Sequence, residues 1–308
     1  RKYSRDRSAL CIGFLFRARE IADPIMRQEI ISHLKSLLSD SDDWMKEVSK
    51  TALQSLAKND VNHNQILKNL DLNAIAKNLQ KELKGSEQEK QDIMQMQEFD
   101  CVLLYSILHG REDIQLRRDL INFGIVDALL HIFASRDLNE ITQPYTQAFF
   151  VFTHPSNFTL YQLLIEKSPF FSLLRLFDHK DEDIISDIIS SIDSILYAGA
   201  IGTELTSQHP YYTDLATAGG IEKVYSLFKQ STVEFHKIVS AICLGMVFRA
   251  QEIKDSDMKE EIITYLKCIV DSNDDIKTQN EIKLAIKCLA QNQVNRVEIE
   301  NDGFTIPK

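Results

Sequence analysis

Apolar residues along the chain recur at the three- and four-residue spacing of an α-helix. One stripe consists of Ile30, Ile31, Leu34, Leu37 and Leu38. A wider stripe of isoleucines runs from Ile184 to Leu196, as expected for a helix packed between neighbours. Asp23-Pro24 and Ser168-Pro169 each place a capping residue before a proline that suits the first turn of a helix. No stretch keeps the alternation of a half-buried strand, so the pattern predicts an all-α fold.

Two stretches of the sequence are copies of one another. Residues 11–43 align without a gap on residues 243–275, and the match continues after a one-residue insertion. About twenty positions in under sixty are identical, where average composition would give only a few. The shared residues include Cys11 and Cys243, Gly13 and Gly245, Phe16-Arg17-Ala18 and Phe248-Arg249-Ala250, Glu20-Ile21 and Glu252-Ile253, and Val61-Asn62 and Val294-Asn295. We therefore expect the same series of helices twice.

The paired glycines fall inside predicted helices. Glycine there costs about 1 kcal/mol relative to alanine. We therefore expect a neighbouring helix to approach closely at Gly13 and at Gly245.

A fainter period lies between the copies, where an aliphatic residue, a short polar stretch and a Gly or Ser precede an amphipathic segment. It recurs at 120–124, 164–168 and 215–219, about every 44 to 54 residues with one longer interval. This spacing predicts about six to seven repeats of two or three helices each. With only 10 Gly and 6 Pro and no linker-like stretch, residues 1–308 are expected to form a single domain. The chain opens without Met and closes in what resembles another repeat, so we expect a fragment of a longer solenoid.

The net charge of −10 and the cysteines narrow the choice of partner and compartment. Phosphate backbones need a basic face, so the charge argues against nucleic acid and favours a basic protein or peptide. Five scattered cysteines without a CxxC pair indicate a reduced, intracellular protein, cytoplasmic or nuclear. No apolar run is expected to reach the roughly 20 residues that span a bilayer, so no membrane partner is expected.

Motifs of catalysis are absent from the sequence. It contains no GxGxxG after a strand, no GxxxxGK[ST], no HExxH and no GxSxG, and its eight histidines are scattered. We therefore predict that the chain is not an enzyme and has no catalytic, cofactor-binding or metal-binding residues.

Ala52–Ala57 (ALQSLA) and Ala285–Ala290 (AIKCLA), with looser forms at 103–108 and 191–196, resemble the long-helix signature of the armadillo/HEAT family. The resemblance covers nearly the whole chain. It implies a right-handed α-solenoid of armadillo-like repeats. It also implies that the third helix of each repeat lines a concave groove, which holds an extended peptide or another protein.

In the nuclear-import adaptors of this family, the groove carries a ladder of Asn and Trp. The positions that match the asparagine are Ser55, Ser106, Ser194 and Cys288, and Trp44 is the one tryptophan. The sequence departs from the Asn/Trp ladder at these positions, which counts against a classical basic-signal import groove. The serines can bond a peptide backbone, or they can be small residues that allow close helix packing.

Two segments interrupt the repeat rhythm. Residues 80–98 are strongly charged and predict a solvated loop or an extended helix end. Residues 198–214 form a long connection that contains Tyr211 and Tyr212. Long connections and paired tyrosines suit partner contacts, although both segments can equally be tolerated insertions.

The sequence thus favours a non-catalytic scaffold that holds a protein or peptide. The predicted contact residues are Ser55, Ser106, Ser194, Trp44, Tyr211 and Tyr212. Two alternatives stay open. One is the targeting or regulatory arm of a larger enzyme, such as a kinase or ubiquitin ligase, and the other is a nuclear-import type of adaptor for basic peptides.

Overall fold

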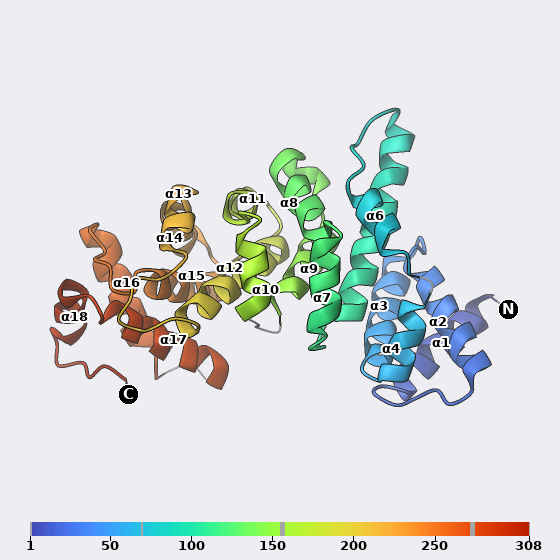
Figure 1. Ribbon diagram of the computed structural model, residues 1–308, viewed down its shortest axis with the longest axis horizontal. Helices are drawn as coiled ribbons and strands as arrows, with labels where there is room; N and C mark the ends of the chain where they lie inside the picture. Colours follow the sequence, from blue (N-terminus) through green and yellow to red (C-terminus); the bar gives the residue numbers. More distant parts are fainter. Residues whose placement is uncertain (1, 69, 155–157, 272–274, 308) are drawn as a thin grey trace. The chain divides into compact units, whose positions relative to one another are not determined.

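The computed structural model describes residues 2–68, 70–154, 158–271 and 275–307. Across these ranges the secondary structure consists of helices, without a strand (Figure 1). The predicted all-α fold is thereby confirmed. The chain divides into two compact units, which are described separately: unit 1 holds residues 1–129 and 142–155, and unit 2 holds residues 130–141 and 156–308. The expectation of a single domain over 1–308 stays a prediction.

In the described part of unit 1, seven helices are complete before α8 begins, and α9 follows. They are α1 (Lys2–Leu15), α2 (Pro24–Leu37), α3 (Asp43–Ala57), α4 (Asp60–Leu67), α5 (Leu72–Leu79), α6 (Glu87–Leu108), α7 (Ile114–Asn122) and α9 (Gln143–Thr153). Helix α8 (Ile125–Ser135) begins in unit 1 and ends in unit 2.

Unit 2 continues with short and long helices in alternation. The α-helices are α10 (Phe158–Ile165), α11 (Phe170–Arg175), α12 (Glu182–Ile201), α13 (Tyr212–Thr217), α14 (Gly220–Gln230), α15 (Glu234–Val247), α16 (Ser256–Ile269), α17 (Ile276–Leu289) and α18 (Gln293–Glu300). The 3-10 turns η1 (Leu138–Glu140) and η2 (Leu176–Asp178) join them.

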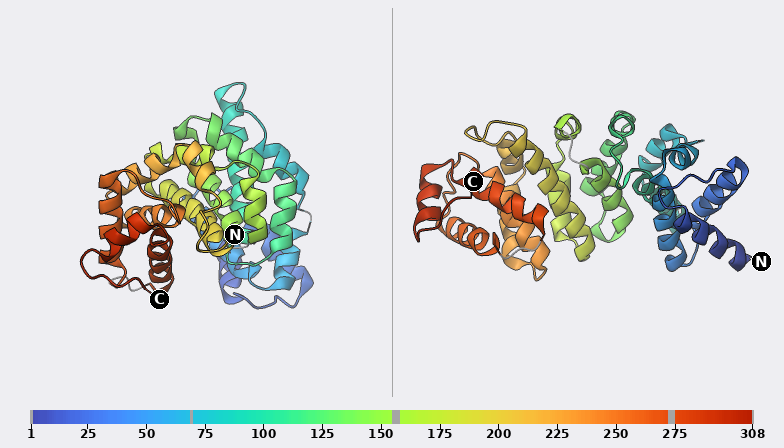
Figure 2. Two further views of the ribbon diagram at one scale, coloured as in Figure 1. Left: turned by 60° about the vertical axis from the view of Figure 1, so that its left-hand side comes forward. Right: turned by 90° about the horizontal axis from the view of Figure 1, so that it is seen from below.

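The long helices of each unit pack on their neighbours along the chain. In unit 1, α3 packs against α6 and α6 against α9; in unit 2, α12 packs against α15 and α15 against α17 (Figures 1 and 2). Their apolar sides are buried, as for Leu53, Leu104, Phe149 and Ile192, each 0% exposed. The helices α3, α6, α9, α12, α15 and α17 therefore take the place of the third helices of successive repeats.

The two sequence copies fold into the same series of helices. Helices α1 to α4 correspond to α15 to α18, and the residues that begin the equivalent helices are the same types. Asp23 and Asp255 cap α2 and α16, and Asn59 and Asn292 cap α4 and α18. Even the unusual backbone is repeated, because Ala18 and Ala250 have φ values of 57° and 55°. The predicted duplication is confirmed.

Both helix glycines of the copies meet a neighbouring helix. A Cβ atom on Gly13 would lie 2.8 Å from the Cβ of Ala52, and one on Gly245 would lie 2.7 Å from the Cβ of Ala285. Such distances are shorter than contacts between real methyl groups. The expected close approach is therefore present at both positions.

One of the two predicted helix caps is present. Asp23 caps α2 as predicted, by accepting hydrogen bonds from the main-chain N–H groups of Ile25 and Met26. Ser168 does not cap α11, because that helix starts at Phe170 and Ser168 has a φ of 50°.

Segment 80–98 was predicted to be either a solvated loop or an extended helix end. Most of it is the extended helix end. A capping box between Ser86 and Glu89 starts α6 at Glu87.

Helix α12 corrects the statement that no apolar run is long enough to cross a bilayer. Residues 182–201 meet that test by length and hydropathy. However, 72% of this apolar window is buried inside the protein. Its isoleucine stripe therefore packs in the core of unit 2, where α10, α11 and α15 contact it.

Candidate functional site

A groove of about 770 Å³ runs across the third helices of unit 1. Each helix contributes residues spaced by three or four positions, so that one side of each helix faces the same hollow. The lining residues are Asp43, Lys46, Glu47 and Lys50 of α3, Gln95, Glu98, Phe99 and Val102 of α6, and Gln143, Pro144 and Gln147 of α9, with 38–41 at one end.

Lys50 connects the three helices at the floor of this groove. Its Nζ lies 2.6 Å from a carboxylate oxygen of Glu47 and 3.3 Å from the side-chain oxygen of Gln147 on α9. It also lies 5.5 Å from the ring centroid of Tyr105 on α6. Although Lys50 is a lysine, its residue exposure is only 8%, because the aliphatic stem is covered.

The charge balance of the groove is acidic. Asp40, Asp43, Glu47 and Glu98 outnumber Lys46 and Lys50 among the lining residues. Lys46 is paired with Asp43 at 2.9 Å, so both lysines already have a carboxylate partner. Three glutamine amides supply neutral donors and acceptors beside these charges. A segment that carries positive charge and unpaired main-chain groups fits such a surface.

A second hollow of about 370 Å³ lies at the other end of α6 and α9. His109 stacks on Tyr105 with ring centroids 4.6 Å apart, and His154 stacks on Phe150 at 4.3 Å. Tyr105 thus contacts both Lys50 of the groove and His109 of the second hollow. Burial, followed by the charges of Lys58, Lys50 and Arg117, lowers the pKa of His109. Its neutral ring offers one donor and one acceptor.

Buried arginines hold the ends of the third helices in place. Arg117 is 0% exposed; its Nε donates to the carbonyl of Val151 at 2.7 Å, and its Nη2 donates to those of Leu108 and His154 at 2.8 and 2.7 Å. One guanidinium thus satisfies carbonyls at the ends of both α6 and α9. This side chain therefore links the ends of the two helices.

In unit 2, Arg249 plays the same part at the end of α12. It is 0% exposed and donates to the carbonyls of Ala200, Ser207 and Gln208 at 2.7, 2.8 and 3.2 Å and to the hydroxyl of Thr203 at 2.5 Å. The long connection in 198–214 is therefore wrapped around one side chain from the turn that follows α15.

His209 fixes the rest of this connection. Its Nε2 lies 2.9 Å from the Leu196 carbonyl, and its Nδ1 accepts the main-chain N–H of Tyr211 at 3.2 Å. Only the neutral ring protonated at Nε2 makes both bonds. Burial lowers the pKa of His209 to about 4, which agrees with that assignment. The absence of a side chain at Gly199 leaves the space for the His209 and Tyr211 rings.

The six predicted contact residues fall in different environments. Ser55, Ser106 and Ser194 are 7%, 1% and 4% exposed. The hydroxyls of Ser106 and Ser194 donate to the carbonyls four residues earlier. Their burial agrees with the alternative that they are small residues for close helix packing. A role in binding a peptide backbone stays a prediction.

The aromatic candidates also differ from one another. Trp44 is 56% exposed on the first turn of α3, next to groove residue Asp43. Tyr211 is only 7% exposed, and Tyr212 lies edge-on to Phe248 at 5.7 Å. Tyr211 is thus buried in unit 2, whereas Tyr212 is half-buried and packs against Phe248. The groove residues themselves were missed, although charged residues at positions 43, 46, 47 and 50 recur at helical spacing and were a visible signal.

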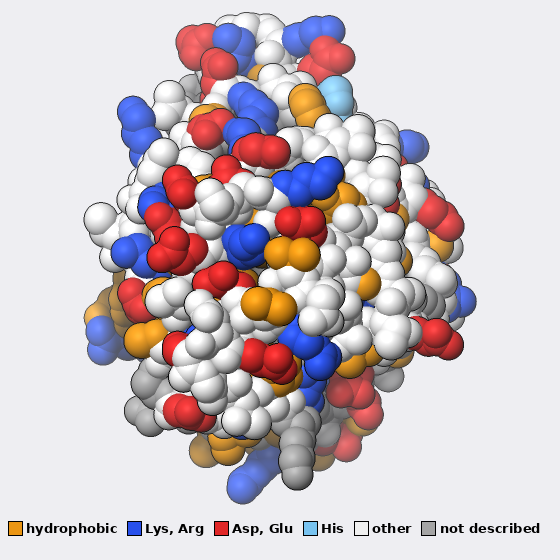
Figure 3. All heavy atoms as spheres, turned by 90° about the vertical axis from the view of Figure 1, so that its left-hand side faces the viewer, with side chains coloured by type: hydrophobic (Ala, Val, Ile, Leu, Met, Phe, Trp, Pro, Cys, Tyr) orange, Lys and Arg blue, Asp and Glu red, His pale blue; other side chains and the backbone are white. Residues whose placement is uncertain are grey.

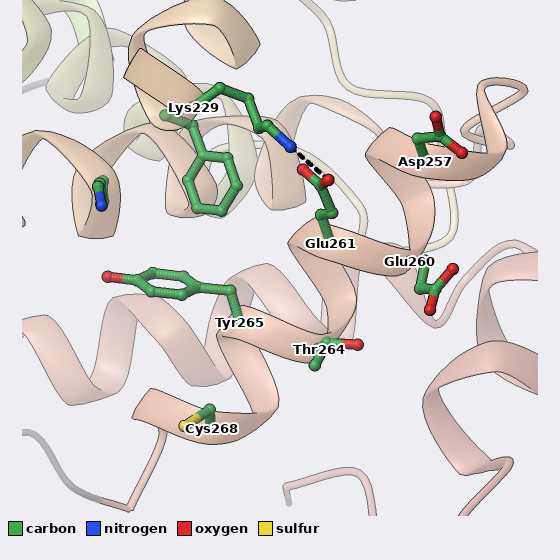
Figure 4. Close-up of a pocket in the computed structure, with 9 residues that line it drawn as sticks. Lys229, Asp257, Glu260, Glu261, Thr264, Tyr265 and Cys268 are labelled. Carbon is green, nitrogen blue, oxygen red and sulfur yellow. Dashed lines mark hydrogen bonds and ion pairs between the residues drawn. The ribbon is translucent and has the colours of Figure 1, made fainter. Parts of the chain in front are cut away.

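Unit 2 has a more open hollow of about 650 Å³ between α14 and α16 (Figure 4). Lys229 and Glu261 form an ion pair across it, and the hydroxyl of Tyr225 donates to Glu261 at 2.8 Å. Burial, together with the bond to Glu261, raises the pKa of Tyr225 to about 12. Lys229, Glu261 and Tyr225 satisfy one another here, and most of the lining residues come from α14 and α16, which are not third helices. This hollow is therefore a weaker candidate than the groove of unit 1.

A buried acidic cluster lies in unit 2, where α12, α15 and α17 adjoin. Asp193 and Glu281 are each 8% exposed, and the Cys243 thiol lies 3.8 Å from Asp193. Burial and then the Glu281 charge raise the pKa of Asp193. Among the described residues, no group of three or more His, Cys, Asp or Glu is arranged to hold a metal ion.

The surface charge is mixed in sign on the face shown in Figure 3. Asp and Glu side chains alternate there with Lys and Arg, and hydrophobic side chains are scattered between them.

Comparisons with known proteins identify the fold. No protein-family model matches the sequence, and no curated protein matches it either. Among solved structures, a computationally designed armadillo repeat protein for modular peptide recognition matches with a TM-score of 0.52 and 15% identity, covering 84% of this chain and 99% of its own.

Two further structures agree. A designed armadillo repeat protein in complex with the peptide (KR)4 matches with a TM-score of 0.51 and 15% identity over 84% of this chain and 98% of its own. A structure described for a phosphorylation switch that controls the interaction between cadherin and beta-catenin also matches. Its TM-score is 0.57 and its identity 12%, over 98% of this chain and 52% of its own. The helix order, the duplicated segment and these similarities together show that the chain has an armadillo-like helical-repeat fold.

Proposed function

We propose that the chain is a non-catalytic scaffold that binds an extended segment of another protein in the groove of α3, α6 and α9. The observation that carries the proposal is the row of groove residues, which places glutamine amides and paired charges from three successive helices around one hollow. Amide side chains can bond the main chain of an extended peptide, which has free donors and acceptors at every residue. The structural relatives support this function, since one is designed for peptide recognition and another holds a peptide.

We further propose that the bound segment is basic. The groove has more carboxylates than lysines, and the whole chain carries a net charge of −10. Complementary charge speeds association and excludes acidic competitors more than it raises affinity. The intracellular location, in the cytoplasm or nucleus, is likewise a proposal; it rests on the five free cysteines.

The test is a titration of the full chain with a fluorescent peptide of alternating Lys and Arg, followed by anisotropy. Glu47→Gln and Glu98→Gln in the groove should each weaken binding about two- to fivefold, because each removes one favourable charge. Glu47→Gln also leaves Lys50 without its carboxylate partner.

The matched controls are Asp257→Asn and Glu260→Gln, which make the same charge change in the open hollow of unit 2. They should leave the affinity unchanged. Equal weakening by groove and control variants would mean that the peptide follows net charge only, and the proposed site would be wrong. Equal affinity for a Glu/Asp peptide would overturn the preference for a basic partner.

A further inference from the structure

The second hollow of unit 1 continues the surface that carries the acidic groove. The side chains along this surface follow helical spacing from the groove into the hollow: Glu98, Val102, Tyr105 and His109 on and directly after α6, and Gln143, Gln147, Phe150 and His154 on and directly after α9. Tyr105 connects the two ends, since it contacts both Lys50 of the groove and His109 of the hollow. The groove and the second hollow therefore lie on one continuous path along α6 and α9.

The walls of the second hollow are largely aromatic. His109 lies on the α6 side, and Phe150 and His154 lie on the α9 side. The ring planes within the two stacked pairs make angles of only 30° and 23°. A flat side chain can pack on such rings in an offset or edge-on arrangement. The volume of about 370 Å³ is at the lower end of the range for ligand sites, about 300 to 1,000 Å³, which suits one large side chain.

Buried hydrogen bonds hold these walls in place. Arg117 donates to the carbonyls of Val151 and His154, which both line the hollow. It also donates to the carbonyl of Leu108, directly before His109. A site whose walls are already fixed loses little further freedom when a side chain enters, and its affinity is higher for that reason.

The excess of carboxylates that marks the groove ends before this hollow. The charged lining residues here are Arg111 and Glu112, one of each sign, and Arg111 already has a carboxylate partner. Burial lowers the pKa of His109, and the positive charges of two nearby lysines and one arginine lower it further. An incoming cation would meet the same positive charges. A neutral side chain therefore fits this hollow better than Lys or Arg.

His109 also offers a hydrogen bond to an aromatic side chain that carries a donor. Its neutral ring has one accepting nitrogen, and within the described residues neither ring nitrogen has a hydrogen-bond partner. The N–H of Trp and the O–H of Tyr can donate to it, whereas Phe has no donor. The hollow is therefore matched best by Trp or Tyr.

We propose that the second hollow binds the side chain of a Trp or Tyr that belongs to the same basic segment as the residues in the groove. This inference rests on the proposed function above. Glu98 and His109 are eleven positions apart, which is about 16 Å along a helix and about five residues of an extended chain. The recognised sequence thus carries basic residues and an aromatic residue about five positions away.

The test titrates the full chain with labelled peptides that contain Lys-Arg-Lys-Arg, a four-residue Gly/Ser spacer and Trp, made in both chain directions. The reference peptides have Gly in place of Trp. In one direction Trp should strengthen binding about five- to tenfold in anisotropy, since packing of the ring adds to the same charges. A Trp peptide with a one-residue spacer should not show this gain, because its ring cannot reach the hollow while the basic residues occupy the groove.

Variants of the hollow locate the ring. His109→Ala and Phe150→Leu should each remove most of the gain from Trp and leave the affinity for the Gly peptide unchanged. The matched controls are His131→Ala and Phe123→Leu, which change an exposed histidine and a 40% exposed phenylalanine outside both hollows. They should keep the full gain. Circular dichroism checks the fold of each variant, and His109→Ala alters only an exposed side chain.

The outcomes separate this inference from the proposed function. No binding of any of these peptides would overturn both. Binding of the Gly peptide that weakens in Glu47→Gln, without a gain from Trp in either direction, would leave the groove in place and overturn the aromatic site. The same conclusion follows if the gain is unchanged in His109→Ala and Phe150→Leu, or if the short spacer gives an equal gain. An equal gain from Leu in place of Trp would contradict an aromatic partner.

Discussion

Asn62 and Asn295 make the same pair of hydrogen bonds in the two copies of the repeated segment. Each side-chain oxygen accepts the main-chain N–H of an isoleucine, Ile21 at 3.1 Å and Ile253 at 3.2 Å. Each side-chain nitrogen donates to the carbonyl two residues before that isoleucine, at 2.7 Å in both cases. Both asparagines are 0% exposed. One side chain therefore holds the turn between two helices against a third helix.

Replacing Asn295 by alanine should lower the free energy of unfolding by about 2 to 4 kcal/mol, because a buried N–H and a buried carbonyl both lose their partner. Urea unfolding followed by circular dichroism measures the change. The matched control is Asn280→Ala, since Asn280 is exposed on α17 and should change stability by less than about 0.5 kcal/mol. Equal effects of the two variants would contradict the role of Asn295.

Gly245→Ala should destabilise the chain by about 1 to 3 kcal/mol, although alanine is the better helix former. The added methyl group would lie 2.7 Å from the Cβ of Ala285, so α15 and α17 must move apart. The double variant Gly245→Ala with Ala285→Gly moves the methyl group across the same contact. The double variant should regain most of the stability that Ala285→Gly alone loses. Thermal unfolding of the parent, the two single variants and the double variant gives the coupling energy between the two positions. Independent effects of the two substitutions would rule out the close contact.

The sequence predicted the helices well because their cause is local. The apolar period, the capping residues and the duplicated segment all act within a few turns of chain, and Asp23 and Asp255 cap their helices as the pattern indicates. The glycine pair was readable for the same reason, since a costly residue at two equivalent positions needs a packing explanation.

The groove was harder to predict, because it depends on how each helix is rotated about its axis. One residue turns the helix by about 100°. Ser55 lies on the buried side of α3, whereas Lys50 and Glu47 face the groove. Alignment to a family signature finds the helix but does not identify which neighbours cover each side. The arginine clamps were missed for a related reason, since Arg249 is more than forty residues from the carbonyl of Ala200.

Unit 2 should lose stability as the pH rises, because Asp193 is buried in it. Burial raises the pKa of this carboxyl above its unfolded value, so the folded state holds its proton more tightly than the unfolded state does. The contribution is favourable at low pH and is lost as the pH increases through the interval between the unfolded and folded values. Asp193→Asn should therefore gain stability relative to the parent between pH 5 and pH 8, measured by urea unfolding at both values. The exposed Glu222→Gln should show no such dependence; the same slope in both variants would contradict the assignment.

His209 should act in the opposite direction at acid pH. Its pKa of about 4 in the folded chain lies below the ordinary 6.5, because the buried neutral ring bonds the Leu196 carbonyl and the Tyr211 N–H. The stability it provides is complete above pH 6.5 and is lost as the pH falls toward 4, by about 3 kcal/mol in total.

His209→Gln should flatten this acid dependence between pH 6.5 and 4.5, at the cost of lower stability at pH 7.5. Urea unfolding at four pH values measures the slope, and His131→Gln provides the control, because His131 is exposed on α8. An unchanged slope in His209→Gln would assign the acid sensitivity to other groups.

Arg249 and Arg17 allow a direct comparison of one sequence motif in two environments. Arg249→Met leaves the buried carbonyls of Ala200 and Ser207 without their donor, which should cost about 3 to 5 kcal/mol. Arg17→Met removes an exposed side chain and should cost less than about 0.5 kcal/mol in the isolated chain. Because the connection at 202–211 is wrapped around Arg249, its main-chain amides should exchange with deuterium much faster in Arg249→Met. The amides of α1 should exchange at an unchanged rate in Arg17→Met. Similar losses in the two variants would mean that the motif acts within its own helix, and that the carbonyls of α12 are satisfied in another way.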